Sequence, residues 1–331
     1  MTQVARRATA LDVARAAGVS KTTVSYVLND TPNQQIPEHT RQRVYDAVRE
    51  LDYTPSSAAR ALRRGRNDVV LLILPDWPLT HVMARILDEL TNELQRSDLV
   101  LLTRRRQERQ SLVTMSREVM PAAVIAFGEI DRAELAVIQA GGTYVASALL
   151  AGDTALGRAV VVPQEHIGEF QLQHLVSRGH TRIGYATITD PQLESFIRLR
   201  VQGARLAALQ RGLDAPEIID IGSSFEGAKA AVESWLAEGI TGVAAYNDQV
   251  AAALLAAMRA LGLSAPGDLA LIGVDDEPLS RFLVPPLTTV RQNEQMIAQH
   301  MAKVVVEGIA GRPAPHLSSA NAIEVIDRES A

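Results

Sequence analysis

The sequence predicts a small N-terminal all-α head followed by an α/β body of two doubly wound lobes. Residues 9–29 carry two short helical patterns joined by a turn at Gly18. From residue 67 onward, short apolar runs alternate with amphipathic helical patterns, which is typical of parallel sheets covered by helices on both faces. With 331 residues, 47% of them apolar, the chain is long enough for two or three compact units.

The first helix of the head is expected to begin at Thr9. Thr9 and Asp12 form a capping-box-like pair, which satisfies backbone amides at a helix start. Gly18 then turns the chain, because glycine adopts positive φ without a steric penalty. The apolar stripe of this helix consists of Val13, Ala14 and Ala17.

A second helix is expected from Lys21 to Leu28, with Ser20 as its N-cap and an apolar inner face. A third helix over residues 36–51 closes a small core around the first two. The pattern favours a DNA-binding helix-turn-helix, and an ordinary helical hairpin is the alternative. The outer face of the second helix is polar and can meet phosphates and base edges in a major groove; it consists of Lys21, Thr22, Ser25, Tyr26 and Asn29.

Charge is distributed unevenly along the chain. The net charge is −5, yet residues 1–66 carry more basic than acidic side chains and the rest carries the acidic excess. A basic head suits contact with a polyanion such as DNA. The chain has no cysteine, and it shows no long apolar run, no secretory signal and no phosphate-binding glycine motif. We therefore expect a cytoplasmic protein that is not an enzyme and needs no metal or cofactor.

Residues 52–66 are expected to form a hinge segment between head and body. Pro55 and Gly65 bracket a stretch that is too short to hold as an isolated helix in water. Leu62 is the large apolar residue among its arginines, and it suits an apolar wedge between base steps in a minor groove. The alternative is that Leu62 packs on the body.

Several motifs resemble the lactose/galactose repressor family of transcriptional regulators, and the resemblance runs essentially from end to end. They are Thr9 to Asn29, P-S-S-A-A-R-A-L-R after Tyr53, R-L-R-V-Q-G at 198–203, Y-N-D-Q at 246–249, L-I-G-V-D-D at 271–276 and P-P-L-T-T-V-R-Q at 285–292. The resemblance implies a repressor with a periplasmic-binding-protein-like body, acting as a homodimer on a pseudo-palindromic operator and controlled by a small polar effector such as a sugar. The implied parts are a helix-turn-helix domain at 1–51, the hinge at 52–66 and a body at 67–331, with one lobe at about 67–162 and 293–320 and the other at about 163–290 and 322–328.

The expected DNA contacts come from the head and the hinge. They are Thr9, Ser20, Lys21, Thr22, Thr23, Ser25, Tyr26, Asn29, Tyr53, Ala59, Leu62 and Arg63. Tyr26 stands where many family members have an arginine, so the resemblance does not determine which operator bases this protein recognises.

Buried strands are expected at residues 69–74, 99–102, 123–127, 143–147, 183–188, 218–221, 242–245 and 269–274, with a final strand at 322–328 and a helix at 81–94. Ligands bind outside the carboxyl ends of strands in such folds, so polar or aromatic residues just after the apolar runs are candidates for the effector site. By this argument we place Asp76 and Trp77 there. The resemblance implies the further contacts Arg200, Asn247, Asp275 and Gln292.

Alternatives remain for several acidic and basic residues. Asp248 and Asp276 can be helix N-caps instead of ligands, and an acidic helix start is favoured over a metal site at residues 275–277. Arg104, Arg105, Arg106 and Arg109 are expected to form a solvated loop, with contact to an anionic effector or DNA as the alternative.

The rival functions are a transport-type solute-binding protein and a sugar-active enzyme that uses Asp275 and Asp76 as carboxylates. The motif Trp77-Pro78-Leu79 replaces the common Asn-Pro-Phe of the family, so the effector need not be an ordinary hexose. The absence of leucine heptads after the last strand argues against a tetramer.

Overall fold

The computed structural model describes residues 8–28, 34–53, 67–106, 110–127, 130–150, 159–161, 164–222, 224–313 and 322–331. The chain divides into two compact units, Met1–Asp68 and Val69–Ala331, called the head and the body below. Within the described ranges, none of the helices has the length and apolar character needed to cross a membrane.

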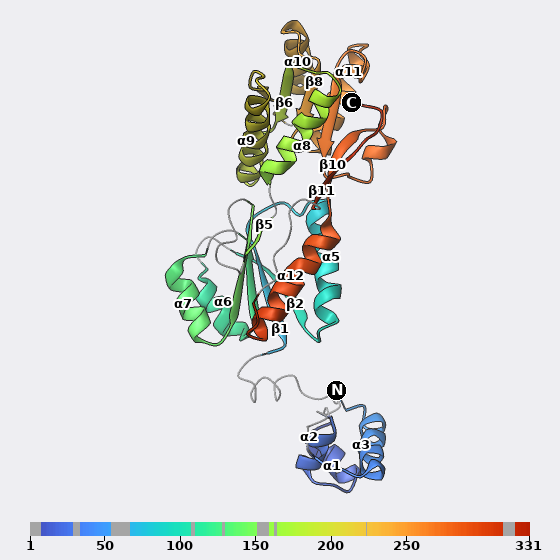
Figure 1. Cartoon of the computed structure of the whole chain (residues 1–331). Coiled ribbons are helices and arrows are strands. Elements are labelled where there is room, and N and C mark those ends of the chain that lie inside the picture. Colours follow the sequence, from blue (N-terminus) through green and yellow to red (C-terminus); the bar gives the residue numbers. More distant parts are fainter. Residues whose placement is uncertain are drawn as a thin grey trace, which may run out of the picture. The chain divides into compact units, whose positions relative to one another are not determined.

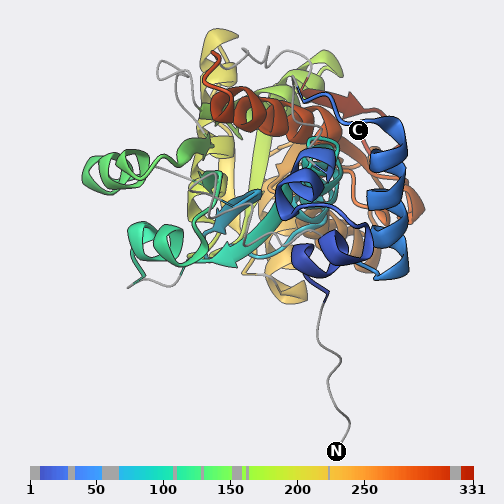
Figure 2. The same ribbon diagram turned by 90° about the horizontal axis from the view of Figure 1, so that it is seen from below.

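The head consists of three helices, α1 (Ala10–Ala16), α2 (Lys21–Leu28) and α3 (Glu38–Glu50), drawn in blue in Figures 1 and 2. The capping box is confirmed: the Asp12 amide donates to the Thr9 hydroxyl at 3.3 Å, and the Thr9 amide donates to the Asp12 carboxylate at 2.9 Å. Gly18 turns the chain at φ +63°. The Thr23 amide donates to Ser20 Oγ at 3.0 Å, as predicted for an N-cap. The core between the helices contains Val13, Ala14, Ala17, Val24, Val27, Val44 and Ala47.

The first lobe of the body is built on a five-stranded parallel sheet in the order β2-β1-β3-β4-β5. Helices α5 and α12 cover one face of this sheet, and α6 and α7 cover the other (Figure 1). The bounds of these elements are β1 Val69–Leu74, α5 His81–Gln95, β2 Val100–Arg105, α6 Leu112–Val119, β3 Ala123–Phe127, α7 Arg132–Ala140, β4 Tyr144–Leu149, β5 Ala159–Val161 and α12 Glu294–Ile309.

The second lobe is built on a six-stranded sheet in the order β11-β10-β9-β8-β6-β7, in which β10 and β11 pair antiparallel and the other described neighbours pair parallel. Helices α8 and α9 lie on one face, and α10 and α11 lie on the other. The bounds are α8 Gln164–Ser177, β6 Ile183–Thr187, α9 Glu194–Gln210, β7 Glu217–Asp220, α10 Phe225–Ala237, β8 Gly242–Ala245, α11 Asp248–Ala260, β9 Ala270–Val274, the short 3-10 helix Ser280–Phe282, β10 Thr288–Gln292 and β11 Ile323–Ile326.

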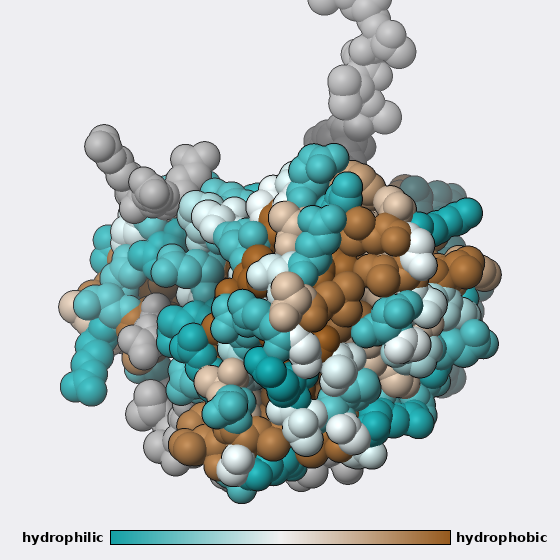
Figure 3. All heavy atoms as spheres, turned by 90° about the horizontal axis from the view of Figure 1, so that it is seen from above, coloured by the Kyte–Doolittle hydropathy of each residue, from teal (hydrophilic) through white to brown (hydrophobic). Residues whose placement is uncertain are grey.

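The predicted fold class is confirmed, since the body has two lobes and α12 returns from the second sheet to pack on the first. Viewed from the end of the body where α10 and α11 lie, the surface carries apolar patches between polar side chains (Figure 3).

Two strands were not predicted from the sequence. These are β5 (Ala159–Val161) and β10 (Thr288–Gln292).

The predicted burial of the strand at 99–102 is wrong. The observed strand β2 lies at the edge of its sheet and is half exposed, with 62% of Val100 and 43% of Leu102 accessible. The strand also runs on into Arg104 and Arg105, which were expected in a loop. Both arginines are held by carboxylates, because Arg104 pairs with Glu118 at 2.7 Å and Arg105 pairs with Asp76 at 3.2 Å. Arg106 pairs with Glu134 at 3.4 Å, and Arg109 lies outside the described residues.

Helices α8 and α9 approach each other closely at two glycines. A Cβ atom on Gly203 would lie 1.8 Å from the Glu165 carbonyl oxygen, and one on Gly168 would lie 1.8 Å from the Arg200 carbonyl oxygen. Backbone therefore packs directly on backbone, which no residue with a side chain allows without moving the helices. This contact fixes where α9 carries Arg200 relative to α8.

We expect Gly203→Ala to lower the free energy of unfolding by about 3 kcal/mol, because the added methyl group forces two packed helices apart. Urea unfolding followed by circular dichroism measures the change. The matched control is Gly141→Ala, where φ is negative and the nearest atom to the new Cβ lies at 3.3 Å. Equal stability of Gly203→Ala and the wild type contradicts the close packing.

Candidate functional site

The outer face of α2 is polar and accessible. Lys21 and Thr22 are exposed, whereas Ser25 and Tyr26 are half-buried beside the buried residues Val24 and Val27. The helix sequence Lys21–Leu28 holds no acidic residue, so nothing on this face repels phosphate.

Other predicted DNA-contacting residues have structural roles in the head. The Thr9 hydroxyl donates to Asp12 at 2.6 Å, and the Ser20 and Thr23 hydroxyls lie 2.9 Å apart. Tyr53 packs against the head core. Four predicted residues lie outside the described part of the chain, namely Asn29, Ala59, Leu62 and Arg63.

A cavity of about 70 Å³ lies between the two lobes, at the carboxyl ends of their strands. The structure brings five of the six predicted effector residues to its walls: Trp77, Arg200, Asn247, Asp275 and Gln292. Pockets for small molecules usually measure about 300–1,000 Å³. A ligand the size of a sugar therefore enters only if the walls separate or a side chain moves.

Asp76 does not line this cavity. Its side chain is 73% exposed, and its carboxylate accepts hydrogen bonds from Arg105 Nη1 at 3.2 Å and from Gln192 Nε2 at 2.9 Å. Because Gln192 belongs to the second lobe, Asp76 joins the two lobes beside the cavity.

Arg200 is the buried cation of the site, with 4% of its surface exposed. Its Nε donates to Gln164 Oε1 at 3.0 Å, and its Nη1 donates to the Tyr246 carbonyl oxygen at 2.6 Å. The guanidinium also lies 4.8 Å from the centre of the Tyr246 ring. Its Nη2 lies 3.6 Å from Asp275 Oδ1, so one positive and one negative charge balance inside the site.

Asp275 occupies a left-handed backbone position, φ 102°, directly after β9. Burial raises the pKa of its carboxyl, while Arg200 and the Gln292 amide oppose the shift. The Gln292 Nε2 atom donates to Asp275 Oδ1 at 3.4 Å. Within the described residues, this carboxylate meets Gln292 and Arg200 through Oδ1, so Oδ2 remains available as an acceptor.

The N-cap alternative for Asp248 and Asp276 is wrong. Asn247 caps α11, because its Oδ1 accepts from the Val250 amide at 2.9 Å. Asp248 lies one residue further on and accepts from Thr289 Oγ1 at 2.6 Å and from the Glu277 amide at 2.8 Å. Asp276 instead pairs with Arg291 and Arg328. In the part of the chain that the structure describes, no acidic or histidine cluster at residues 275–277 or elsewhere forms a metal site.

Aromatic side chains form another wall of the cavity. The Trp77 ring packs edge-on against Phe127, with centroids 5.4 Å apart, and against Phe196 at 4.6 Å. Three further aromatic residues that line the cavity were not predicted from the sequence, namely Phe127, Phe196 and Tyr246. Phe127 ends β3 and Tyr246 directly follows β8, so the carboxyl-end argument could have found both, whereas Phe196 lies inside α9 and carries no such signal.

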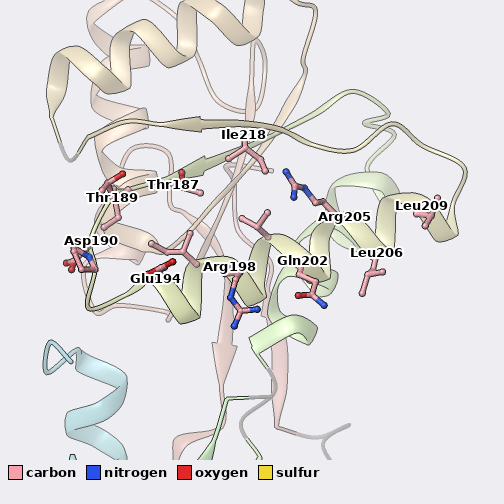
Figure 4. A pocket seen from close by; sticks show the side chains of 14 residues that line it. Thr187, Thr189, Asp190, Glu194, Arg198, Gln202, Arg205, Leu206, Leu209 and Ile218 are labelled. Carbon is pink, nitrogen blue, oxygen red and sulfur yellow. The ribbon is translucent and has the colours of Figure 1, made fainter. Parts of the chain in front are cut away.

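A larger groove of about 830 Å³ lies on the second lobe, along α9 and beside β7 (Figure 4). Figure 4 shows Asp190 and Glu194 toward one end and Leu206 and Leu209 toward the other, with Arg198 between them. None of the predicted effector residues lines this groove.

A three-helix head with a polar second helix, joined to a two-lobed body with a polar cleft, defines a DNA-binding regulator that responds to a small molecule. The comparisons agree. Residues 9–56 match the family described as bacterial regulatory proteins, lacI family, and residues 172–331 match the periplasmic binding protein-like domain.

Relatives of similar length are transcriptional regulators. The regulator GalR of Escherichia coli K12 is 30% identical over 98% of this chain and 95% of its own, and the regulator DegA of Bacillus subtilis 168 is 32% identical over 86% and 87%. The ribose operon repressor of E. coli K12 is 29% identical over 91% and 93%. The chain belongs to the lacI family, and it is a DNA-binding transcriptional regulator whose activity is controlled by an effector.

Solved structures share the fold. A lac repressor dimer bound to operator and the anti-inducer ONPF superposes with a TM-score of 0.78 at 22% identity, covering 98% of this chain and 99% of that one. The regulator CelR in complex with cellobiose gives 0.63 at 25% identity, covering 98% and 100%.

Asp248 generates a pH prediction, because burial raises the pKa of its carboxyl from 3.8 to about 8. The folded state keeps the proton that the unfolded chain loses above about pH 4. Stability from the protonated group is therefore complete below that pH and is lost as the pH rises toward 8. Asp248→Asn keeps the shape and cannot ionise. Between pH 5 and 7.5, its free energy of unfolding should rise relative to the wild type by about 3 kcal/mol, measured by urea unfolding.

Asp268→Asn is the control, because hydrogen bonds from Ser264 lower the pKa of Asp268, which is therefore ionised in both states over this pH range. A constant difference between Asp248→Asn and the wild type contradicts the raised pKa.

Proposed function

We propose that this regulator is a repressor that reads its operator with the outer face of α2. The observation that carries the proposal is the position of Lys21, Thr22, Ser25 and Tyr26 on one accessible, acid-free face of the second helix of the head. In helix-turn-helix proteins this helix enters the major groove. We keep the predicted division into a head at 1–51, a hinge at 52–66 and a body at 67–331, with Leu62 of the hinge as a minor-groove wedge.

The effector site in this proposal is the cavity between the lobes. Arg200, Asn247, Asp275 and Gln292 supply polar groups from one side, and Trp77 supplies an aromatic face from the other. The ribose operon repressor and the CelR–cellobiose complex support a sugar or sugar derivative as the ligand. A ligand that touches both lobes changes their equilibrium only by its differential affinity for the two arrangements, and this difference is passed to the head.

The protein is proposed to act as a homodimer on a pseudo-palindromic operator, since a two-fold protein needs two-fold DNA. An exposed apolar segment follows β9: Leu279 is 70% exposed, Phe282 74% and Val284 80%. Large apolar side chains grouped at the surface mark interaction sites. A lac repressor with the same fold was solved as a dimer. Because the proposed partner is chromosomal DNA, we place the protein in the cytoplasm.

Tyr26→Arg should change the preferred operator at one base pair of each half-site toward guanine, because arginine donates two hydrogen bonds to a guanine edge. Selection from random double-stranded DNA followed by sequencing measures the preference. The control is His39→Arg, which adds the same charge at an exposed position of α3. The control should raise affinity for all sequences alike, and an unchanged preference in Tyr26→Arg removes Tyr26 from base recognition.

Phe282→Glu should convert the dimer to a monomer at micromolar concentration and lower operator affinity by at least tenfold, because a charge replaces an apolar contact at the proposed interface. Light scattering coupled to size-exclusion chromatography measures the mass. Phe225→Glu is the matched control at another exposed phenylalanine, 48% accessible on α10. A Phe282→Glu variant that remains dimeric contradicts the assignment of this surface as the dimer interface.

A further inference from the structure

The two walls of the cavity between the lobes differ in chemistry. The first lobe contributes Trp77, Met83, Ile86 and Phe127, with Thr80 as its polar member. The second lobe contributes the charged and amide side chains, which come from α8, α9 and the ends of β8, β9 and β10, and α9 also contributes the ring of Phe196 beside Trp77. A ligand that satisfies the whole cavity is therefore polar where it meets the ends of these strands and apolar where it meets Trp77, Phe127 and Phe196.

On the polar wall, the positive charge of Arg200 is balanced by the negative charge of Asp275. Arg200 donates to Gln164 and to the Tyr246 carbonyl, and its remaining face meets Asp275. An anionic ligand would have to displace Asp275 from Arg200 or face its carboxylate, and either arrangement costs free energy in a buried site. A cationic ligand would be repelled by the Arg200 guanidinium beside it.

Several hydrogen-bonding atoms of the described residues on this wall remain available to a ligand. In the described structure, Asn247 Oδ1 is used by the α11 N-terminus, which leaves its amide hydrogens as donors. Asp275 Oδ2 is an acceptor, and so is Gln292 Oε1, since Gln292 uses its Nε2 in the hydrogen bond to Asp275 Oδ1. Hydroxyl or amide groups of a neutral molecule match this set.

The apolar wall suits a flat ring better than a hydroxyl-covered one. Trp77 lies edge-on between Phe127 and Phe196, so the site already holds three rings in edge-to-face contact. Aromatic rings favour such geometry with one another, and a bound ring can replace the contacts that Trp77 gives up when the cavity widens. A polyol whose hydroxyl groups point to this wall would lose hydrogen bonds to water without replacement.

We propose that the effector is an uncharged molecule in which a hydroxyl-bearing ring is joined to a flat aromatic ring, the chemistry shared by a nucleoside and an aryl glycoside. The inference rests on the proposed function, because it names the ligand class of the same cleft. The sugar part binds to Asn247, Asp275 and Gln292, and the aromatic part packs on Trp77 and Phe196.

The test is isothermal titration calorimetry of the full-length protein with matched ligands. Phenyl β-D-glucopyranoside is compared with methyl β-D-glucopyranoside and glucose 6-phosphate, and uridine is compared with ribose and uridine monophosphate. At least one of the two neutral compounds with an aromatic ring, phenyl β-D-glucopyranoside or uridine, should bind at least tenfold more tightly than both of its counterparts, and the set that responds identifies the source. Failure of both aromatic compounds to bind, or equal binding of a counterpart that lacks the aromatic ring or carries a phosphate, overturns the inference.

Trp77→Leu should weaken binding of the compound with the aromatic ring about tenfold. Leu79→Ala should leave this binding unchanged, because Leu79 is an exposed residue of the same loop that does not line the cavity. Phe196→Leu provides a second variant should Trp77→Leu fail to fold. Unchanged affinity in the folded variants also overturns the inference.

Operator affinity is measured on the same samples, with and without each ligand. If only a sugar without an aromatic ring or a sugar phosphate alters operator affinity, the proposed function stands and this inference fails. If no operator can be selected from random DNA, the proposed function itself fails, whatever the calorimetry shows.

Discussion

The buried guanidinium of Arg200 is the constraint around which the second lobe and its cleft are organised. A buried charge is tolerated only when it is paired and hydrogen-bonded, and Arg200 meets this need with Gln164 of α8, the carbonyl of Tyr246 after β8 and Asp275 after β9. These partners come from three separate elements. The side chain can reach all of them because Gly168 and Gly203 let α8 and α9 pack backbone against backbone. The cost of burying the cation thus fixes the polar wall of the cleft.

The cleft unites two lobes that are otherwise separate cores. Each sheet has its own buried cluster, and the contact between Asp76 and Gln192 lies at the surface, where exposed polar pairs contribute little. Groups inside the cleft, including Trp77 against Phe196 across the two lobes, therefore contribute to holding the lobes at one angle, together with the chain segments that cross between the sheets. A ligand bound in the cleft contacts both lobes and so changes the relative free energies of the different lobe angles. This is the physical basis for control of DNA binding from a distance.

Much of the architecture could be predicted from local signals. The strands Val69–Leu74, Ala123–Phe127 and Gly242–Ala245 have the predicted bounds, as does α2, because apolar runs and capping residues act over a few positions. The position of a strand at the edge of a sheet cannot be predicted from such local signals. Val100 and Leu102 resemble a buried strand in sequence, but β2 has a neighbour on one side only, so the strand is half exposed. The role of Asp76 shows the same limit, because the partners that draw it away from the cavity lie 29 and 116 positions along the chain.

The sequence by itself determined the class of protein, the helical head, the two lobes and most of the residues around the cleft. These follow from periodicity, capping pairs, glycine turns and motifs, all of which are written along the chain. Only the tertiary structure decided that Arg200 and Asp275 neutralise each other, that Asn247 and not Asp248 caps α11, and that Phe127 and Phe196 enclose Trp77. The reason is that charge balance and ring packing depend on distances between side chains far apart in the chain, which are set when the two sheets and their helices pack.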